Sequence, residues 1–485
     1  MLLDVTAILT TSANLNAVVE AFDVPASSSV VAVASLPMDP SRAAFEAALD
    51  AASHPASTVS VSPSGTGPDP VVGPQPDGVS AQIPVARVPI TRLPSLNGMP
   101  LLQQLSLLDR STLAGYADAH TSQLAALIAH QPAAADVRSW WSGVSDAKKT
   151  AMAAETPELV GNLEGLPYGV RDRANRASLT QAEGAIRSQL RAGVGRAAAD
   201  ELNRRLHMLE QVRDALRVGS SHNARTLVAL NPAGEGTAVI VIGDVTTADY
   251  VDYVIPGMFS SIAGQLGGFT AGTDRIVSDQ QAWLKRLQPT DTPTVAAVAW
   301  IGYQTPNLSN VATLDLAEQG EAALTASIQG LRAVRAGNQP YLSILAHSYG
   351  STTAMLALQR NDISVDALAV FGSPGAPAAS VDQLHVADRN VWVGAAQWDP
   401  VPETGLFGSQ PTSASFGAHR FGVDGIVDPV TGKQLGDAVS HNDYFTAGSE
   451  SLRNLELIGI GRGDLVLAPG GSLALGGSPA KALGR

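Results

Sequence analysis

The residue with the clearest capacity for covalent chemistry is Ser348, at the centre of the sequence AHSYG. The apolar run Leu342–Leu345 before it predicts a buried strand, and Ser351–Arg360 after it predicts a helix. A serine on such a sharp strand-to-helix turn needs small residues two positions before and after it, which Ala346 and Gly350 supply. The helix N-terminus directs partial positive charge at the serine oxygen, so the pattern predicts a nucleophilic serine.

Short β-rich segments alternate with helical patterns after residue 219, which predicts a mainly parallel sheet covered on both faces. The predicted strands are Thr226–Leu230, Ala238–Ile242, Val251–Ile255, Val295–Trp300, Leu342–Leu345, Ala367–Phe371 and Val391–Ala395. The predicted helices are Arg275–Leu287, Leu316–Val334, Ser351–Gln359 and a closing helix at Ser449–Leu457. The fifth strand is the one that leads into the serine.

A serine on the turn after the fifth strand resembles the nucleophile elbow of α/β-hydrolases, with Ala346 in place of the usual glycine. The resemblance implies an α/β-hydrolase fold, a mainly parallel doubly wound sheet, for residues 219–465. It also implies a catalytic set that follows the chain in the order serine, acid, histidine.

A serine hydroxyl becomes nucleophilic when a histidine takes its proton and an acid holds that histidine in one tautomer. His441 lies in a polar loop just before the closing helix, where the resemblance places the base, whereas His419 alternates with apolar residues and fits a strand better. Asp399 follows the last predicted strand and precedes a proline-stiffened turn, so it is the candidate acid. Weaker candidates for the acid are Glu403, Asp424, Asp428 and Asp443, of which the last is too near His441 in sequence.

Backbone N–H groups must also stabilise the negative charge that develops on the substrate oxygen, in an oxyanion hole. One donor is expected from Tyr349, the residue after the nucleophile. The other is expected from the loop after the third strand, where Gly257 lets the backbone turn inward. Met258 is therefore the first candidate donor of that loop and Phe259 the second.

Two further segments are expected beside this site. His347 is expected to pack against the turn rather than to transfer protons, and Trp300–Tyr303 is expected to line the floor of the pocket. No glycine-rich phosphate loop and no HExxH or other metal-ligand spacing occurs in the sequence, so we expect neither a cofactor nor a metal.

Composition excludes several classes of function. A net charge of −13 without a basic cluster argues against nucleic-acid binding. The absence of cysteine excludes disulfides, a cysteine nucleophile and thiolate metal sites. The start of the sequence lacks the features of a signal peptide, and no run of 18 apolar residues occurs. We therefore expect no membrane span and a cytoplasmic location, with export independent of a signal peptide as the alternative.

The chain divides by composition into five segments. Residues 1–53 are expected to form an N-terminal helical segment, and residues 54–100, which hold ten of the thirty prolines, a linker. Residues 101–218 show apolar positions at helical spacing and predict a mostly helical domain ahead of the catalytic domain. The glycine-rich residues 466–485 are expected to form a tail.

A more specific resemblance rests on Gly161–Arg176, which contains GNL, GLP, RD and ANR, together with Trp398–Pro402 and His441–Tyr444. These segments resemble an actinobacterial family of α/β-hydrolases with a helical N-terminal region, known as a domain of unknown function (DUF1023-like). Taken singly, residues 161–176 fit a capped loop whose Arg and Asp side chains dock the helices onto the sheet. The W-x-G at Trp141–Gly143 is similar to the turn of small type VII secretion proteins, although tryptophan packing in a helical bundle is favoured.

The preferred function is a serine hydrolase that cleaves a lipid or other acyl ester through Ser348, Asp399 and His441 and an acyl-enzyme intermediate. An acyltransferase with the same three residues, in which an alcohol replaces water, is the alternative enzyme. The alternative from another class is a secreted effector or partner-binding module that binds a protein through its helical region.

Overall fold

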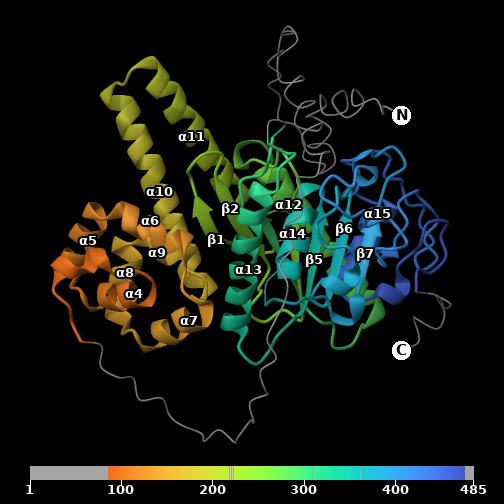
Figure 1. Ribbon diagram of the computed structural model, residues 1–485, viewed down its shortest axis with the longest axis horizontal. Coiled ribbons are helices and arrows are strands. Elements are labelled where there is room, and N and C mark those ends of the chain that lie inside the picture. Colours follow the sequence, from red (N-terminus) through yellow and green to blue (C-terminus); the bar gives the residue numbers. More distant parts are fainter. Residues whose placement is uncertain are drawn as a thin grey trace, which may run out of the picture.

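The computed structural model describes residues 86–475, except residues 218, 220, 222, 308, 309 and 361. The predicted helical segment 1–53, the first part of the predicted linker and residues 476–485 lie outside the described residues. The described chain forms a helical region followed by a domain built on one large sheet (Figure 1).

The sheet has eight strands in the order β1-β2-β4-β3-β5-β6-β7-β8. The strands are β1 (Arg225–Asn231), β2 (Thr237–Ile242), β3 (Tyr250–Ile255), β4 (Val295–Ile301), β5 (Tyr341–His347), β6 (Ala367–Phe371), β7 (Val391–Gly394) and β8 (His419–Arg420). β2 runs antiparallel to β1 and to β4, and every other neighbouring pair is parallel. All seven predicted strands are present, so the predicted mainly parallel sheet is confirmed.

Helices cover both faces of the sheet because its strands are apolar on both sides. The helices of this domain are α12 (Ile262–Leu287), α13 (Asp315–Arg335), α14 (Tyr349–Arg360) and α15 (Glu450–Gly459), with short 3-10 helices at Val381–Gln383, Ala387–Arg389, Val401–Glu403 and Gly463–Leu465. On β2, Ile240 packs toward α12 and α15, whereas its neighbour Val241 packs toward α13 and α14. This alternation is the geometry of a strand buried on both faces.

The largest difference from the predicted helices is the start of α12. The sequence predicts a helix from Arg275, but α12 begins at Ile262. Glycine weakens a helix by roughly 1 kcal/mol relative to alanine, and four glycines lie in this first part. Burial of Leu266 and Phe269 in the core outweighs that low intrinsic preference.

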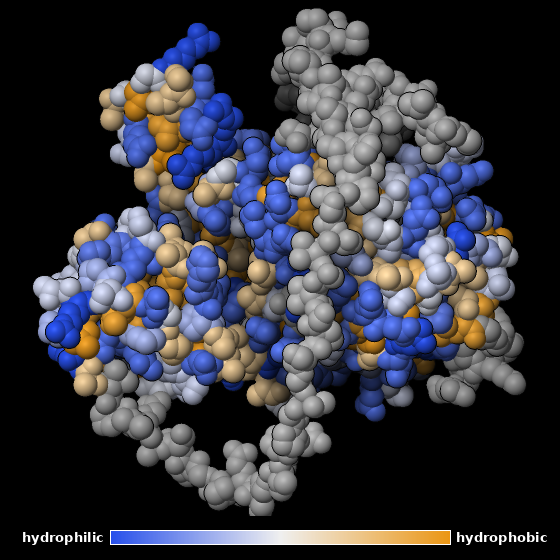
Figure 2. Space-filling model, viewed as in Figure 1, coloured by the Kyte–Doolittle hydropathy of each residue, from blue (hydrophilic) through white to orange (hydrophobic). Residues whose placement is uncertain are grey.

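The helical region consists of short helices followed by a long helical hairpin. Its elements are the 3-10 helix η1 (Ile90–Ser95), α4 (Gly98–Leu107), α5 (Arg110–Ala119), α6 (Thr121–Ala129), α7 (Ala134–Gly143), α8 (Asp146–Glu155), α9 (Pro157–Asn162), α10 (Tyr168–Ala192) and α11 (Arg196–Ala215). The far end of the α10–α11 hairpin projects from the body of the molecule (Figures 1 and 2). Within the described residues, no helix combines the length and apolar character that crossing a bilayer requires.

The predicted linker extended to residue 100, but structured elements begin earlier. Leu93 in η1 is fully buried in the core of the helical region, and α4 begins at Gly98. Pro100 lies in the first turn of α4, where a helix does not need the N–H group that proline lacks. The boundary was therefore misplaced because prolines that predict a linker are also compatible with a helix start.

Side chains of the helical region form hydrogen bonds with backbone groups of β1, the strand at one edge of the sheet. Asn162 makes two hydrogen bonds with Leu230 of β1. Its Nδ2 donates to the Leu230 carbonyl oxygen at 3.1 Å, and its Oδ1 accepts the Leu230 N–H at 2.9 Å. Asp172 accepts the N–H of Leu227 at 2.7 Å, and Asn175 donates to the Leu227 carbonyl oxygen at 3.1 Å. An edge strand otherwise exposes such groups to pairing with another chain. These side chains belong to the segment on which the specific resemblance rests, so that segment docks the helices onto the sheet.

A buried ion pair reinforces this junction. Arg171 donates to Glu164 through both terminal nitrogens, one of them at 2.8 Å, and both residues are buried. A Cβ atom added at Gly330 of α13 would lie 2.0 Å from Glu164 Oε2, so only glycine allows this close approach. Burial raises the pKa of the Glu164 carboxyl, and the neighbouring guanidinium offsets this only in part.

We predict that Arg171→Met lowers the free energy of unfolding by about 3–5 kcal/mol, because it leaves a buried carboxyl without its partner. The double variant Arg171→Met/Glu164→Met keeps similar unbranched chains and removes both charges, so it should be clearly more stable than the single variant. Urea denaturation of the two variants and the wild-type protein measures both values. Equal stability of the single variant and the wild-type protein would contradict this account of the junction.

Candidate active site

Ser348 lies on a strained turn between β5 and α14. Its φ of +54° is in the left-handed region, which costs a non-glycine residue roughly 1–2 kcal/mol. The N–H of Ser348 donates to the carbonyl oxygen of Phe371 in β6 at 2.9 Å, which holds the turn in place. A Cβ atom at Gly350 would lie 2.4 Å from the carbonyl oxygen of Pro256, so the second small position of the predicted turn tolerates no side chain.

The loop after β3 passes directly over the serine. A Cβ atom at Gly257 would lie 2.5 Å from Cβ and 3.0 Å from Oγ of Ser348. The Tyr303 hydroxyl donates a hydrogen bond to the carbonyl oxygen of Pro256 at 2.9 Å, which helps to hold this loop in place. Trp300 and Tyr303, which we expected on the pocket floor, are both buried, and Tyr303 reaches the site through this bond to Pro256.

The backbone of this loop distinguishes between the two candidate donors for an oxyanion. Phe259, the second candidate, donates its N–H to the carbonyl oxygen of Pro306 at 3.0 Å, so this N–H already has an acceptor. The N–H of Met258 makes no hydrogen bond among the described residues. Tyr349 is the first residue of α14, and the N–H groups of a first helical turn have no acceptor within the helix. Met258 and Tyr349 therefore have the N–H groups that could bind an anionic oxygen.

The predicted base contacts the serine, and the predicted acid contacts the base. His441 Nε2 lies 2.8 Å from Ser348 Oγ, and His441 Nδ1 lies 2.9 Å from both carboxyl oxygens of Asp399. The carboxylate accepts hydrogen bonds, so Nδ1 carries the proton and Nε2 is left to accept the proton of the serine hydroxyl. Residues 348, 399 and 441 thus form one hydrogen-bonded chain from three separate loops.

The electrostatic environment keeps Asp399 ionised. Burial raises the pKa of this carboxyl, but hydrogen bonds from His441, the Tyr444 hydroxyl and the Val401 N–H together hold it below its ordinary value. Asp399 is only 5% exposed, so water does not screen its effect on the imidazole. The negative charge next to Nδ1 favours a positively charged imidazole whenever Nε2 accepts a proton.

The residues that were weaker candidates have other partners or positions. His419 lies on β8, with its ring 5.0 Å from that of Trp392. Asp428 forms a buried ion pair with Arg453 at 2.9 Å. Asp443 accepts backbone N–H groups at 2.6 and 3.1 Å within its own loop. The exposed residues Glu403 and Asp424 make no hydrogen bond with the imidazole of residue 441 among the described residues.

Tyr444 is a site residue to which the sequence analysis assigned no role. Its hydroxyl donates to Asp399 Oδ2 at 2.7 Å and accepts the N–H of Ala396 at 2.8 Å. Its place in the matching segment His441–Tyr444 was the available signal. Gly372, with φ of +57°, lies directly against Asp399 and His441, since a Cβ atom there would come within 3.0 Å of both side chains.

We predict that Tyr444→Phe lowers kcat for ester hydrolysis roughly tenfold, because a hydrogen bond to a charged group contributes about 1.5–3 kcal/mol. Tyr116→Phe is the matched control, since its hydroxyl bonds to Gln123 at 2.5 Å in the helical region. That variant should keep its kcat. Steady-state kinetics of both variants, with thermal unfolding in parallel, test the prediction, and an unchanged kcat in Tyr444→Phe would contradict it.

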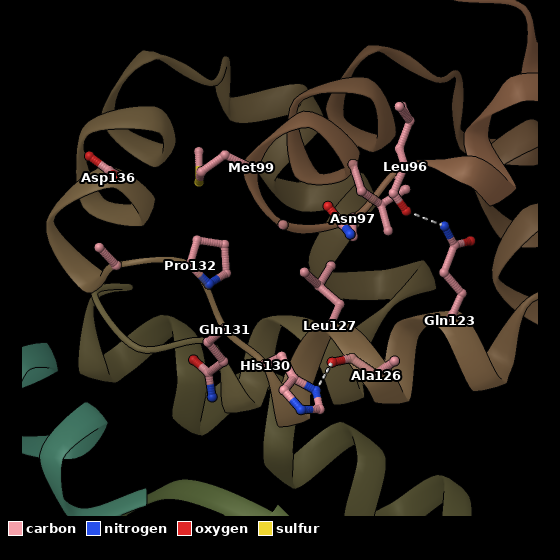
Figure 3. A pocket seen from close by; sticks show the side chains of 13 residues that line it. Leu96, Asn97, Met99, Gln123, Ala126, Leu127, His130, Gln131, Pro132 and Asp136 are labelled. Atoms are coloured by element: carbon pink, nitrogen blue, oxygen red, sulfur yellow. Dashed lines mark hydrogen bonds between the residues drawn. The ribbon is translucent and has the colours of Figure 1, made fainter. Parts of the chain in front are cut away.

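A separate pocket lies in the helical region, between α4, α6 and α7 (Figure 3). It has a volume of about 520 Å³ and is lined by Leu96, Asn97, Gly98, Met99, Leu101, Gln123, Ala126, Leu127, His130, Gln131, Pro132, Ala133 and Asp136. The amide of Gln123 already donates to the carbonyl oxygens of Leu93 and Leu96, at 2.9 and 2.8 Å. In the part of the chain that the structure describes, no group of three His, Asp or Glu residues is arranged to hold a metal ion.

The strand order, the strained serine turn and the three residues on separate loops define an α/β-hydrolase domain. A family model described as alpha/beta hydrolase matches residues 231–408. The expected resemblance to an actinobacterial α/β-hydrolase family is confirmed by this match and by mycobacterial relatives. The chain is 30% identical over 387 residues to an uncharacterised protein of Mycobacterium tuberculosis, which covers 70% of this chain. It is also 28% identical over 243 residues to one of Mycobacterium bovis, with 48% of this chain and 88% of that protein covered.

The chain spans 57% of the length of the first of these relatives. Solved structures that are similar to this chain include an S-formylglutathione hydrolase from Agrobacterium tumefaciens, with 13% identity, 50% of this chain and 96% of that chain covered, and a TM-score of 0.29. A hyperthermophilic esterase from Pyrobaculum calidifontis has 12% identity, 59% of this chain and 97% of that chain covered, and a TM-score of 0.31.

Proposed function

We propose that the protein is a serine hydrolase that cleaves an acyl ester through an acyl-enzyme intermediate. The observation that carries the proposal is the 2.8 Å separation between His441 Nε2 and Ser348 Oγ, together with the Asp399 carboxylate on the opposite nitrogen. A general base must lie within about 2.6–3.2 Å of the atom whose proton it takes. This histidine meets that requirement without any rearrangement.

In the proposed reaction, His441 takes the hydroxyl proton as Ser348 Oγ attacks the ester carbonyl carbon. The carbonyl oxygen becomes negatively charged and accepts hydrogen bonds from the N–H groups of Met258 and Tyr349. The tetrahedral intermediate then expels the alcohol, which receives its proton from the imidazolium. Water, deprotonated by the same imidazole, attacks the acyl-enzyme, and the imidazolium returns a proton to Ser348 Oγ as the bond to the acyl carbon breaks, which releases the carboxylic acid and the free serine. Asp399 stays ionised and stabilises the imidazolium in both steps.

Exposed apolar side chains next to the site support an apolar acyl group as substrate. Large hydrophobic side chains that remain exposed include Phe259 at 38%, Trp398 at 71% and Val439 at 42%. Each lies within two residues of a proposed site residue: Met258, Asp399 or His441. Exposed apolar side chains that gather at a site favour an apolar ligand.

The test has two separate parts: labelling of one sample of the wild-type protein with a fluorophosphonate probe, and hydrolysis of p-nitrophenyl esters of increasing acyl length by unlabelled protein. We predict that Phe259→Asn lowers kcat/KM for long acyl chains several-fold and leaves hydrolysis of the acetate ester nearly unchanged. Asparagine is chosen because it tolerates the φ of +59° at this position. Removal of an apolar contact costs roughly 1–3 kcal/mol in a hydrophobic site.

Val427→Asn is the matched control, because Val427 is 54% exposed but lies away from the proposed site residues in sequence. It should leave the chain-length preference unchanged. If Phe259→Asn had the same ratio of kcat/KM for long and short esters as the wild-type protein, the role of Phe259 would be contradicted. Absence of both probe labelling and ester hydrolysis in the wild-type protein would contradict the proposed function itself.

A further inference from the structure

The residue before the nucleophile contacts the loop that carries the base. His347 Nε2 lies 2.7 Å from the backbone carbonyl oxygen of His441. A carbonyl oxygen only accepts hydrogen bonds, so His347 carries its proton on Nε2 and donates it. The two imidazole rings lie 4.6 Å apart, and the ring of Phe371 stacks against His347 at 5.5 Å.

His441 needs such an attachment because it lies in a loop, outside any helix or strand. Asp443 organises the loop locally by accepting the N–H groups of Val439 and Ser440. Trp398 donates its N–H to the Val439 carbonyl oxygen at 3.1 Å, which connects the loop to the segment that carries the acid. Among the described residues, the bond from His347 is the one that joins the backbone of His441 to β5, and hence to the strand that carries the nucleophile.

We propose that His347 is a positioning residue that sets the distance between the histidine base and the serine nucleophile. The inference rests on the proposed function, in which Ser348 and His441 are the reacting pair. His347 is the last residue of β5 and Ser348 follows it directly, so the position of His347 is fixed relative to the nucleophile. The hydrogen bond from His347 therefore fixes the backbone of His441 relative to Ser348 as well. Proton transfer depends steeply on donor–acceptor geometry, so a loop displaced by about 1 Å can lower the rate about a hundredfold.

The chemistry of the donor also suits this place. Burial and the neighbouring His441 lower the pKa of His347 to about 3, so its imidazole donates a hydrogen bond while uncharged. Next to the imidazolium that forms during the reaction, a positively charged donor such as lysine would oppose its formation. A neutral N–H donor fixes the base without reducing its basicity.

Three substitutions in the full chain separate the hydrogen bond from the volume of the side chain. His347→Gln places an amide N–H near the position of Nε2, His347→Asn has a shorter amide that does not reach the carbonyl of His441, and His347→Leu fills space without a donor. The measurements are kcat and KM with p-nitrophenyl butyrate, the rate of fluorophosphonate labelling, thermal unfolding, and the downfield proton resonance of the His441–Asp399 hydrogen bond.

We expect His347→Gln to stay within about fivefold of the wild-type kcat, and His347→Asn and His347→Leu to lose about 10–100-fold in kcat with little change in KM. The labelling rate should fall in parallel, and the downfield resonance should broaden only in the last two variants. Wild-type kcat in a folded His347→Asn or His347→Leu variant would overturn the proposal, as would equal losses in all three. Should His347→Leu fail to fold, the comparison of Gln with Asn decides. An inactive, unlabelled wild-type protein would instead count against the proposed function.

Discussion

Ser348→Ala is expected to abolish fluorophosphonate labelling and to lower kcat/KM for short p-nitrophenyl esters on the order of a million-fold. Ser348 Oγ is the atom that lies 2.8 Å from the imidazole Nε2, and alanine removes it while keeping Cβ. The rest of the site should stay in place, because the backbone bond from residue 348 to Phe371 does not depend on the side chain. Hydrolysis assays and thermal unfolding of the purified variant measure both effects.

Ser348→Gly provides a control that separates chemistry from strain. It should be as inactive as Ser348→Ala, yet more stable than the wild-type protein by roughly 1 kcal/mol, because glycine adopts the φ of +54° without cost. An increase in stability would support the strained turn even if no substrate were known. Substantial residual turnover by either variant, in protein free of contaminating esterase, would eliminate Ser348 as the nucleophile.

His441→Ala is expected to cause a loss of activity comparable to that of Ser348→Ala, because residues that act as one unit are not additive. The double variant should therefore be hardly slower than either single variant. His419→Ala is the matched control, since the His419 ring packs on Trp392 and makes no hydrogen bond with Ser348. A dead His419→Ala variant and an active His441→Ala variant would reverse the assignment of the base.

The same reaction predicts the sign of the pH dependence. A histidine accepts the serine proton only in its neutral form, so activity should rise with pH along one limb. His347 should not add a second limb, because burial and the neighbouring His441 hold its pKa at about 3. Asp399 should not limit the rate at neutral pH either, since its pKa lies below the ordinary value and the carboxylate is present there. Measurement of kcat/KM as a function of pH, for the wild-type protein and for Tyr444→Phe, would test this dependence.

Local sequence determined the sheet, the candidate nucleophile and the order of the three candidate catalytic residues. Buried parallel strands are short apolar runs bounded by helices and turns, a pattern that single segments carry without reference to the rest of the chain. The small residues Ala346 and Gly350 are equally recognisable from the sequence next to Ser348. The contact that excludes a side chain at Gly350, with the carbonyl oxygen of Pro256, is by contrast a tertiary one. Chain order left His419 and His441 as candidate bases, and their immediate neighbours favoured His441, because His419 alternates with apolar residues whereas His441 lies in a polar segment.

Tertiary packing decided what depends on contacts between distant segments. Burial of Phe269 extended α12 through glycines that predict no helix, and Pro306 took the N–H of Phe259 that the loop sequence left available. Asn162 satisfies β1 across 68 residues, and His347 reaches the His441 carbonyl across 94 residues. Spacing in sequence carries no information about such bonds, because their geometry exists only after the strands have paired and the loops have closed over them. For that reason the candidate nucleophile could be proposed from ten consecutive residues, whereas the partners that hold the candidate base and acid could not.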